Sequence, residues 1–245
     1  MRQVIWHDVE CGSYDADLPL WEELATRATP VLELGCGSGR VALHLARLGH
    51  EVAGLDADAP LVEAFNSRAR EEALPARAGV ADATSFALET RFGLVIAPMQ
   101  LVQILGGEPS RRAMLARVAD HLQPGGLLAA PLVDPRDLPD AATGPIEDRG
   151  VAPLPDVREL DGWIYSSLPL DVRRANGRIS IERLRQAVSP SGEVSEAVDI
   201  TELDPISPAT FEAEARDAGL RAAARRPVPA TNWHVGSTVC VVEAP

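Results

Sequence analysis

The chain contains no lysine, so arginine supplies all 23 of its basic side chains, against 36 acidic ones. The formal net charge of −13 argues against nucleic acid as the main partner, because phosphate binding requires a basic face. Long apolar runs are also missing, and none reaches the ~18 residues that a membrane span requires. We therefore expect neither a nucleic acid nor a membrane partner.

Cysteine is scarce as well. The three cysteines, Cys11, Cys36 and Cys240, are scattered, odd in number and form no C-x-x-C pair. This usage suits a reducing compartment and argues against a disulfide framework. Since polar residues also interrupt the N-terminus, where a secretory signal would be apolar, we expect a cytoplasmic protein.

The chain does contain a glycine-rich stretch that follows a short apolar run. Val31, Leu32 and Leu34 form a run that is typical of a parallel strand covered on both faces. Three glycines at alternate positions then let the backbone turn sharply and approach a ligand. A helix expected over residues 40–48 directs its N-terminal N–H groups back at this turn.

The spacing of these glycines separates two classes of cofactor site. The dinucleotide fingerprint G-x-G-x-x-G fails at its last position, which is Arg40. The pattern Glu33-x-Gly35-x-Gly37-x-Gly39 instead resembles the first motif of the class I S-adenosylmethionine-dependent methyltransferases. An acidic residue two positions before the first glycine fits that family and not the dinucleotide folds. A nicotinamide-dependent reductase is therefore the weaker alternative.

Four later features occur in the order that this family shows. A second strand ends in Asp56, and a third strand end carries Asp82. Residues 92–100 resemble the fourth strand of the family, and residues 122–128 its L-x-P-G-G turn into the fifth strand. With the glycine motif, the resemblance covers roughly the first 135 residues.

The resemblance implies S-adenosylmethionine as the cofactor. It places Asp56 on the ribose hydroxyls, which one carboxylate can accept together, and Asp82 at the adenine amino group. A helix N-cap is the alternative role for Asp56 or Asp58, and both roles can hold at once. Tyr14 stands where its phenol could reach the methionyl carboxylate, or it is an aromatic anchor. The expected cofactor-binding residues are Tyr14, Glu33, Gly35, Cys36, Gly37, Gly39, Arg40, Asp56, Ala57, Asp82, Ala83, Pro98, Met99 and Gln100.

Strand and helix patterns alternate after a leading amphipathic helix expected over residues 15–28. Such alternation predicts β–α–β crossovers and a doubly wound, mostly parallel α/β sheet of seven strands. Ligands bind such sheets at the carboxyl ends of the strands. The expected strands are residues 31–34, 51–55, 77–81, 92–97, 126–133, 220–228 and 237–242, and the later helices are 40–48, 60–72, 109–122 and 207–219.

An insertion interrupts this alternation. Residues 134–162 contain five prolines, too many for a regular element, and predict a loop. Residues 163–206 alternate polar and apolar positions around turn signals, which predicts a three-stranded antiparallel meander. We expect a methyltransferase core over 1–136 and 207–245 and an insertion over 137–206. The insertion either covers the acceptor pocket or forms the subunit interface of a homodimer.

Three residues are candidates for a general base that would act on the acceptor. His234 lies in the turn before the seventh strand, at the expected cofactor edge, and is the first candidate for a general base. Asp134 and His7 are the competing bases, and a structural role for His234 is the alternative. Because four convergent ligands are the rule for structural metal sites, we expect no metal at His7-Asp8-x-x-Cys11.

We expect methyl transfer to an oxygen or nitrogen atom of a small-molecule acceptor. A methyltransferase acting on a peptide or protein and a non-catalytic cofactor-binding subunit are the alternatives. Nothing in the sequence identifies the acceptor itself.

Overall fold

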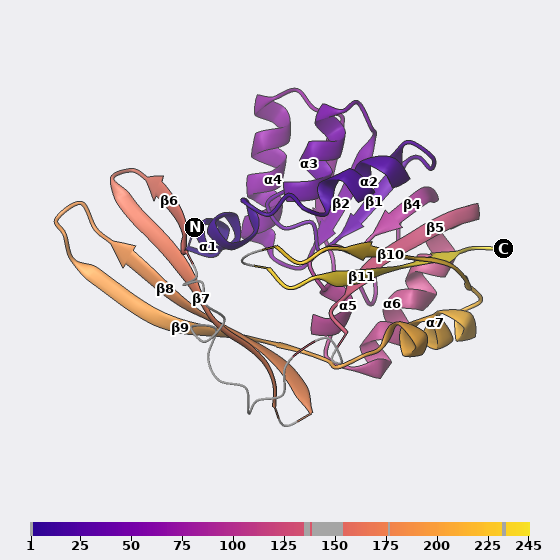
Figure 1. Ribbon diagram of the computed structural model, residues 1–245. Helices are drawn as coiled ribbons and strands as arrows, with labels where there is room; N and C mark the ends of the chain where they lie inside the picture. The colour runs from indigo at the N-terminus through magenta and orange to yellow at the C-terminus, as the bar shows by residue number, and fades with distance from the viewer. Residues whose placement is uncertain (1, 135–137, 139–153, 176, 232–233) are drawn as a thin grey trace.

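Two sheets make up the molecule (Figure 1). The computed structural model describes residues 2–134, 138, 154–175, 177–231 and 234–245. A seven-stranded sheet with helices on both faces forms the core, and a four-stranded antiparallel sheet stands beside it. The predicted fold class is therefore confirmed.

The core sheet has the strand order β10-β11-β5-β4-β1-β2-β3. The strands β1 to β5 pair in parallel, whereas β11 runs antiparallel to both β5 and β10. The chain order reverses between β1 and β4, and in such sheets the crevice at this point binds the ligand. The strands are β1 (Val31–Leu34), β2 (Val52–Asp56), β3 (Ala76–Val80), β4 (Phe92–Ile96), β5 (Leu122–Leu132), β10 (Arg221–Val228) and β11 (Ser237–Glu243).

Helices bury both faces of this sheet. Val31 packs in one apolar cluster, while Leu32 and Leu34 pack in the other. The alternation follows from the strand geometry, which sends successive side chains to opposite faces. One layer contains α2 (Leu18–Ala25), α3 (Arg40–Arg47) and α4 (Ala59–Glu71), and the other contains α5 (Leu101–Ile104), α6 (Glu108–His121) and α7 (Pro208–Asp217).

The N-terminal segment differs from the prediction of one helix over residues 15–28. It forms α1 (Arg2–Cys11) and the shorter α2. Asp17 precedes α2, but its side chain does not cap the helix and binds Arg40 and Trp21 instead. Helix α1 has only a weak amphipathic pattern because it contacts the second sheet with charged side chains.

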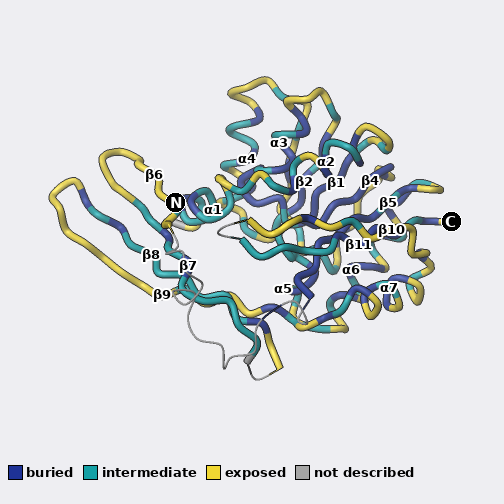
Figure 2. Tube along the Cα trace, in the orientation of Figure 1, coloured by how far each residue is buried: buried dark blue, intermediate teal, exposed yellow. Residues whose placement is uncertain are grey.

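The second sheet has the order β6-β7-β8-β9, with every pair antiparallel. It is visibly more exposed than the core strands (Figure 2). Its long hairpins fall where the alternating pattern predicts strands. The strands are β6 (Asp156–Leu160), β7 (Trp163–Ala175), β8 (Arg178–Val188) and β9 (Val194–Leu203).

The prediction of three strands is wrong by one, because β6 lies inside the segment that was predicted to be a loop. Pro155 is the last proline of that segment, so the five residues that follow are free to pair. Asp161 and Gly162 both have positive φ and turn β6 into β7. An Asp-Gly pair is a hairpin signal, but the polar sequence of β6 and the prolines before it concealed the strand.

One buried glutamine holds both crossings between the core and the second sheet. The side-chain amide of Gln103, on α5, donates to the carbonyl oxygens of Val133 (3.1 Å) and Asp204 (3.0 Å). Its own carbonyl oxygen accepts the N–H of Val133 at 2.7 Å. The chain therefore leaves the core and returns to it at one point.

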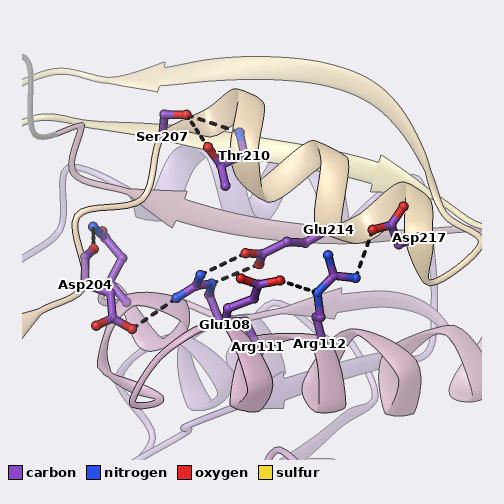
Figure 3. Close-up of polar contacts among 9 residues, drawn as sticks. Glu108, Arg111, Arg112, Asp204, Ser207, Thr210, Glu214 and Asp217 are labelled. Atoms are coloured by element: carbon purple, nitrogen blue, oxygen red, sulfur yellow. Dashed lines mark hydrogen bonds and ion pairs between the residues drawn. The ribbon is translucent and has the colours of Figure 1, made fainter.

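A buried arginine braces the returning chain (Figure 3). The Arg111 guanidinium, on α6, donates to both carboxylate oxygens of Glu214 on α7 at 2.9 and 2.8 Å. It also donates to Asp204 at 3.0 Å, directly after β9. Arg111 thus ties the end of β9 to both α6 and α7, at the place where the second sheet joins the core.

Candidate active site

A cavity of about 630 Å³ opens at the carboxyl ends of β1, β2 and β4 and extends to the second sheet. It combines residues from the predicted cofactor edge with residues from the insertion. From the core, it is lined by Gly35, Leu55, Asp56, Ala57, Ala81, Asp82, Ala83, Thr84, Pro98, Met99, Gln100, Leu101, Ile104, Leu105 and Ser110. The remaining lining residues are His7, Glu10, Cys11, Tyr14, Pro169, Val172, Ile181, Arg183, Thr201, Leu203, His234 and Val235.

The glycine turn forms a bare backbone wall at this cavity. Gly35 and Gly37 have φ values of 64° and 53°, which L-residues rarely adopt. A Cβ on Gly37 would lie 2.1 Å from Nε2 of His7, so a side chain has no room there. Gly35 therefore leaves bare backbone at the cavity wall, whereas the His7 ring occupies the space beside Gly37.

Asp56 ends β2 inside the cavity. One oxygen of its carboxylate accepts the N–H of Gly37 at 2.8 Å, and the other accepts the N–H of Asp58 at 2.9 Å. Each oxygen keeps a second lone pair, so the carboxylate can still accept two ribose hydroxyls. Asp58 caps α4 by accepting the N–H of Leu61 at 3.2 Å. The predicted cap is therefore confirmed at Asp58.

Asp82 lies at the other end of the cofactor edge. Its carboxylate accepts the hydroxyl of Thr84 at 2.6 Å and the N–H of Thr84 at 2.7 Å. These hydrogen bonds lower the pKa of Asp82, so it is ionised at neutral pH. Ala83 lies next to it in the cavity wall. An adenine amino group, which donates, suits an acceptor that is held this way.

The turn after β4 carries two consecutive residues in a strained conformation. Met99 and Gln100 have φ values of 52° and 56°, although neither is glycine. Such conformations occur mostly where the surrounding structure holds a functional site. Both residues line the cavity with Pro98, so this predicted stretch lies where the cofactor motif places it.

Five of the predicted cofactor residues lie behind the wall rather than in it: Glu33, Cys36, Gly37, Gly39 and Arg40 do not line the cavity.

Glu33 is fully buried beneath α3, where the backbone N–H of Ala42 donates to its carboxyl group. Among the described residues, its Oε2 atom has no hydrogen-bond partner. Burial, only partly offset by Arg40, raises the pKa of Glu33 to about 8. The side chain therefore lies between β1 and α3, with its carboxyl group largely protonated at neutral pH.

Arg40 connects the glycine turn to the leading segment. Its guanidinium pairs with both carboxylate oxygens of Asp17 at 2.7 Å and donates to the carbonyl oxygen of Tyr14 at 2.8 Å. The guanidinium carbon also lies 5.2 Å from the centre of the Tyr14 ring. These contacts hold the ring against the cavity, where burial raises the pKa of the Tyr14 phenol to about 12.

His7 reaches the cavity from α1. Its Nδ1 atom lies 3.0 Å from the hydroxyl of Ser38, which donates to Asp8 at 2.6 Å. Burial lowers the pKa of His7, despite the nearby carboxylate of Asp8, so the ring is neutral at pH 7. Asp8, the middle residue of the motif His7-Asp8-x-x-Cys11, accepts hydrogen bonds from Arg68.

His234 faces Tyr14 across the same part of the cavity, with ring centres 4.7 Å apart. Its Nδ1 atom lies 3.3 Å from the hydroxyl of Thr231, whereas its buried Nε2 atom has no partner in the described part of the chain. Burial lowers the pKa of His234, and Asp156 offsets part of that effect. The ring therefore presents a neutral nitrogen that can accept a proton.

The other candidates for the acceptor site are placed differently. Asp134 is buried at the end of β5 but does not line the cavity. This position leaves His234 and His7 as the predicted bases that reach it. Asn232 and Trp233, which share the turn with His234, lie outside the described residues.

Two charged residues of the site were missed from the sequence. Glu10, on α1, accepts hydrogen bonds from Nε and Nη2 of Arg185, each at 2.7 Å. It also accepts a hydrogen bond from the hydroxyl of Ser167 at 2.8 Å. Burial acts to raise the pKa of Glu10, but these hydrogen bonds hold it below its ordinary value. Arg183, on β8, donates to Asp156 at 2.5 Å and to Ser167 at 2.8 Å.

The alternating pattern of β8 carried a signal for Arg183. Ile179, Ile181, Arg183 and Arg185 are two residues apart, so they share one face of the strand. If Ile181 is assigned to the face that turns toward the core, Arg183 is expected on that same face. Glu10 had no comparable signal, because α1 itself was not predicted.

Comparison with known proteins agrees with this site. Residues 31–126 match the model of a family described as a methyltransferase domain. The matched stretch makes up 96 of the 245 residues and includes the glycine turn, Asp56 and Asp82. The predicted resemblance is thus confirmed, and S-adenosylmethionine, the cofactor it implies, fits the bare glycine turn and Asp56. In the described part of the chain, no helix is both long and apolar enough to cross a membrane.

Two curated methyltransferases and a protein described as hemagglutinin 1, from Eikenella corrodens, are similar to this chain. A dTDP-3-amino-3,4,6-trideoxy-alpha-D-glucopyranose N,N-dimethyltransferase from Streptomyces venezuelae is 26% identical over 178 residues, 73% of this chain and 63% of that protein. The matched stretches span 36% to 63% of the length of the curated relatives.

Two solved structures share the fold over nearly the whole chain. An S-adenosylmethionine-bound amino pentose methyltransferase from Micromonospora echinaspora has a TM-score of 0.72 at 20% identity, covering 99% of this chain and 97% of that one. A sugar N-methyltransferase from a Streptoalloteichus species has a TM-score of 0.74 at 17% identity, covering 100% and 92%.

Proposed function

We propose that this protein is an S-adenosylmethionine-dependent N-methyltransferase whose acceptor is the amino group of a small molecule, in the class of amino sugars. The observation that carries the proposal is one cavity that is lined by Gly35, Asp56 and Asp82 and also by His234, whose Nε2 atom has no partner among the described residues. The amino-sugar class is taken from the descriptions of the relatives.

The bound cofactor supplies a methyl group on a positively charged sulfur. In the reaction, the acceptor nitrogen forms a bond to the methyl carbon while the carbon–sulfur bond breaks, and its electron pair remains on sulfur. The product ammonium then releases one proton. Carboxylates such as Asp56 and Asp82 favour a cationic cofactor in this cavity, and alignment of the two reactants can contribute ~7–11 kcal/mol to lowering the barrier.

His234 is the proposed base. An amine enters water-filled sites largely as an ammonium ion, which has no lone pair for attack, so its proton must be removed first. The neutral Nε2 atom of His234 has no competing partner among the described residues and can take that proton. Tyr14 packs on the same ring and holds it in place. His7, which also lines the cavity, is the second candidate.

Other predictions made from the sequence stay predictions. These are the methylation of a peptide or protein, a non-catalytic cofactor-binding role, a homodimer formed through the second sheet, and a cytoplasmic location. An oxygen acceptor is less suited to this site, because a hydroxyl is far less acidic than an ammonium and would need a stronger base than a histidine of lowered pKa.

The test is methyl transfer itself. The purified protein is incubated with S-adenosylmethionine and a panel of amino sugars, matched deoxy sugars without the amine, and short peptides with free N-termini. We expect a mass gain of one methyl group only in the amino sugars, and loss of that gain in Asp56→Ala. Methylation of hydroxyl-only sugars or of peptides alone would contradict the proposal.

A further inference from the structure

The second sheet presents an aliphatic wall to the acceptor end of the cavity. Val172 on β7, Ile181 on β8 and Thr201 on β9 are neighbours in register, so they form one row across the sheet on the inner face. Leu203 extends the wall beside this row, next to Ile179. An acceptor that reaches His234 must lay its remaining atoms along these side chains.

The charges at the same cavity are mostly negative. Glu10, Asp56 and Asp82 line it, and Arg183 is the one arginine among the described lining residues. The Arg183 guanidinium is already engaged, because it donates to Asp156 and Ser167 and lies 3.8 Å from Glu10. In the part of the cavity that the structure describes, no cation is left to pair with an anionic acceptor.

This arrangement discriminates between two forms of one amino sugar. A sugar linked to a nucleoside diphosphate brings two phosphate charges. Among the described lining residues these charges would meet Asp56, Asp82 and the Arg185-paired Glu10, but no cation that is not already engaged. The same sugar as a neutral glycoside brings only its ammonium group and an apolar ring face. Repulsion against the wrong ligand is an established source of specificity.

We propose that the acceptor is an amino sugar, or a similar aliphatic amine, that carries no nucleoside diphosphate. This inference rests on the proposed N-methyltransferase function and narrows its substrate class. It places the enzyme after the glycosyl transfer that removes the nucleotide, whereas the Streptomyces venezuelae relative is described as acting on a dTDP-linked sugar.

The test is equilibrium binding to the protein saturated with S-adenosylhomocysteine. The two probes are dTDP-3-amino-3,4,6-trideoxy-α-D-glucopyranose and the methyl glycoside of the same sugar. We expect the glycoside to bind at least about tenfold more tightly, which corresponds to ~1.4 kcal/mol. Equal or tighter binding of the nucleotide-linked sugar, or binding of neither, would overturn the inference.

A pair of variants tests the cause of this selectivity. Thr201→Arg adds a cation to the cavity wall and should tighten binding of the dTDP-linked sugar by about tenfold. Ile200→Arg is the control: it makes the same charge change on the same strand, but on the outer face, where Ile200 is 56% exposed. The control should leave both affinities unchanged. An unchanged ratio of affinities in a folded Thr201→Arg would also overturn the inference.

Turnover separates this inference from the proposed function. If the glycoside binds but is not methylated, the proposed function fails while the acceptor class stands. If the dTDP-linked sugar is methylated with the higher kcat/KM, the proposed function stands and the acceptor class is wrong.

Discussion

The two sheets of this protein contribute to the same cavity in different ways. The core sheet supplies its residues from strand ends: Gly35 follows β1, Asp56 ends β2 and Asp82 follows β3. The second sheet supplies residues from the middle of its strands, through the register of Val172 with Ile181. The cofactor end is therefore determined by local segments, and the acceptor end by pairing between segments that are distant in sequence.

The largest expected effect concerns the joint between the two sheets. Arg111→Ala leaves the buried carboxylate of Glu214 without its partner, and breaking such a buried pair typically costs about 3–5 kcal/mol. Chemical denaturation should show this loss in the free energy of unfolding. The neighbouring Arg112, which pairs with Glu108 and Asp217 (Figure 3), is a matched control. Its side chain is 43% exposed, and such exposed pairs contribute ~0–1 kcal/mol. Equal losses in Arg111→Ala and Arg112→Ala would show that the joint is not braced as described.

The second effect concerns the ionisation of the buried carboxyl group of Glu33. Because the pKa of Glu33 is about 8 in the folded protein and near its ordinary 4.5 when unfolded, the unfolded state binds fewer protons between these values. Stability should then fall as pH rises from about 4.5 to 8. At ~1.4 kcal/mol per pKa unit, the loss is on the order of 4 kcal/mol at pH 8.

Glu33→Gln removes the ionisation and should therefore abolish this part of the pH dependence. We expect its Tm to exceed that of the unmodified protein at pH 8 and to match it at pH 4.5. A parallel fall of Tm in both proteins would assign the pH dependence to other groups.

The third effect tests the base at the acceptor end. His234→Ala should lower turnover by about 10²-fold or more while cofactor binding is kept. The lowered pKa of His234 implies that turnover in the unmodified protein falls only on the acid side of about pH 6.5. His44→Ala serves as the control, since His44 pairs with Glu22 outside the cavity. Retention of the acid limb in His234→Ala would transfer the role to His7.

The smallest effect expected is on cofactor affinity. Asp56→Ala removes a charged acceptor from the cavity, which should cost about 1.5–3 kcal/mol of binding free energy. Calorimetry with S-adenosylmethionine measures this directly. Asp58→Ala should instead cost ~1 kcal/mol of stability by removing the cap of α4, with the affinity unchanged. Unchanged affinity in Asp56→Ala would remove Asp56 from the ribose.

The sequence predicted the core well because its signals are local. The short apolar runs and the glycine spacing placed β1 and β2 with Asp56, and the third strand end placed β3 with Asp82. The second sheet was recognised from its alternation, but β6 was lost beside prolines. Glu33 matched the family motif and yet points beneath α3, because a motif gives the residue and not the direction of its side chain.

The acceptor end could not be assembled in the same way. Glu10 belongs to a helix without a clear apolar face, and its partner Arg185 lies far along the chain. Only the register of the second sheet brings Thr201 beside Ile181. Such pairings depend on tertiary packing, which one sequence without its fold does not reveal.

The clamp formed by Gln103 bears on how this fold can change. Val133 and Asp204 are hydrogen-bonded to the same side chain, so the segment between them leaves the core and returns to it at neighbouring points. Lengthening, shortening or replacing that segment need not move any strand of the seven-stranded sheet. One cofactor-binding frame can therefore carry different acceptor walls, provided that each new segment starts and ends where Gln103 holds the old one.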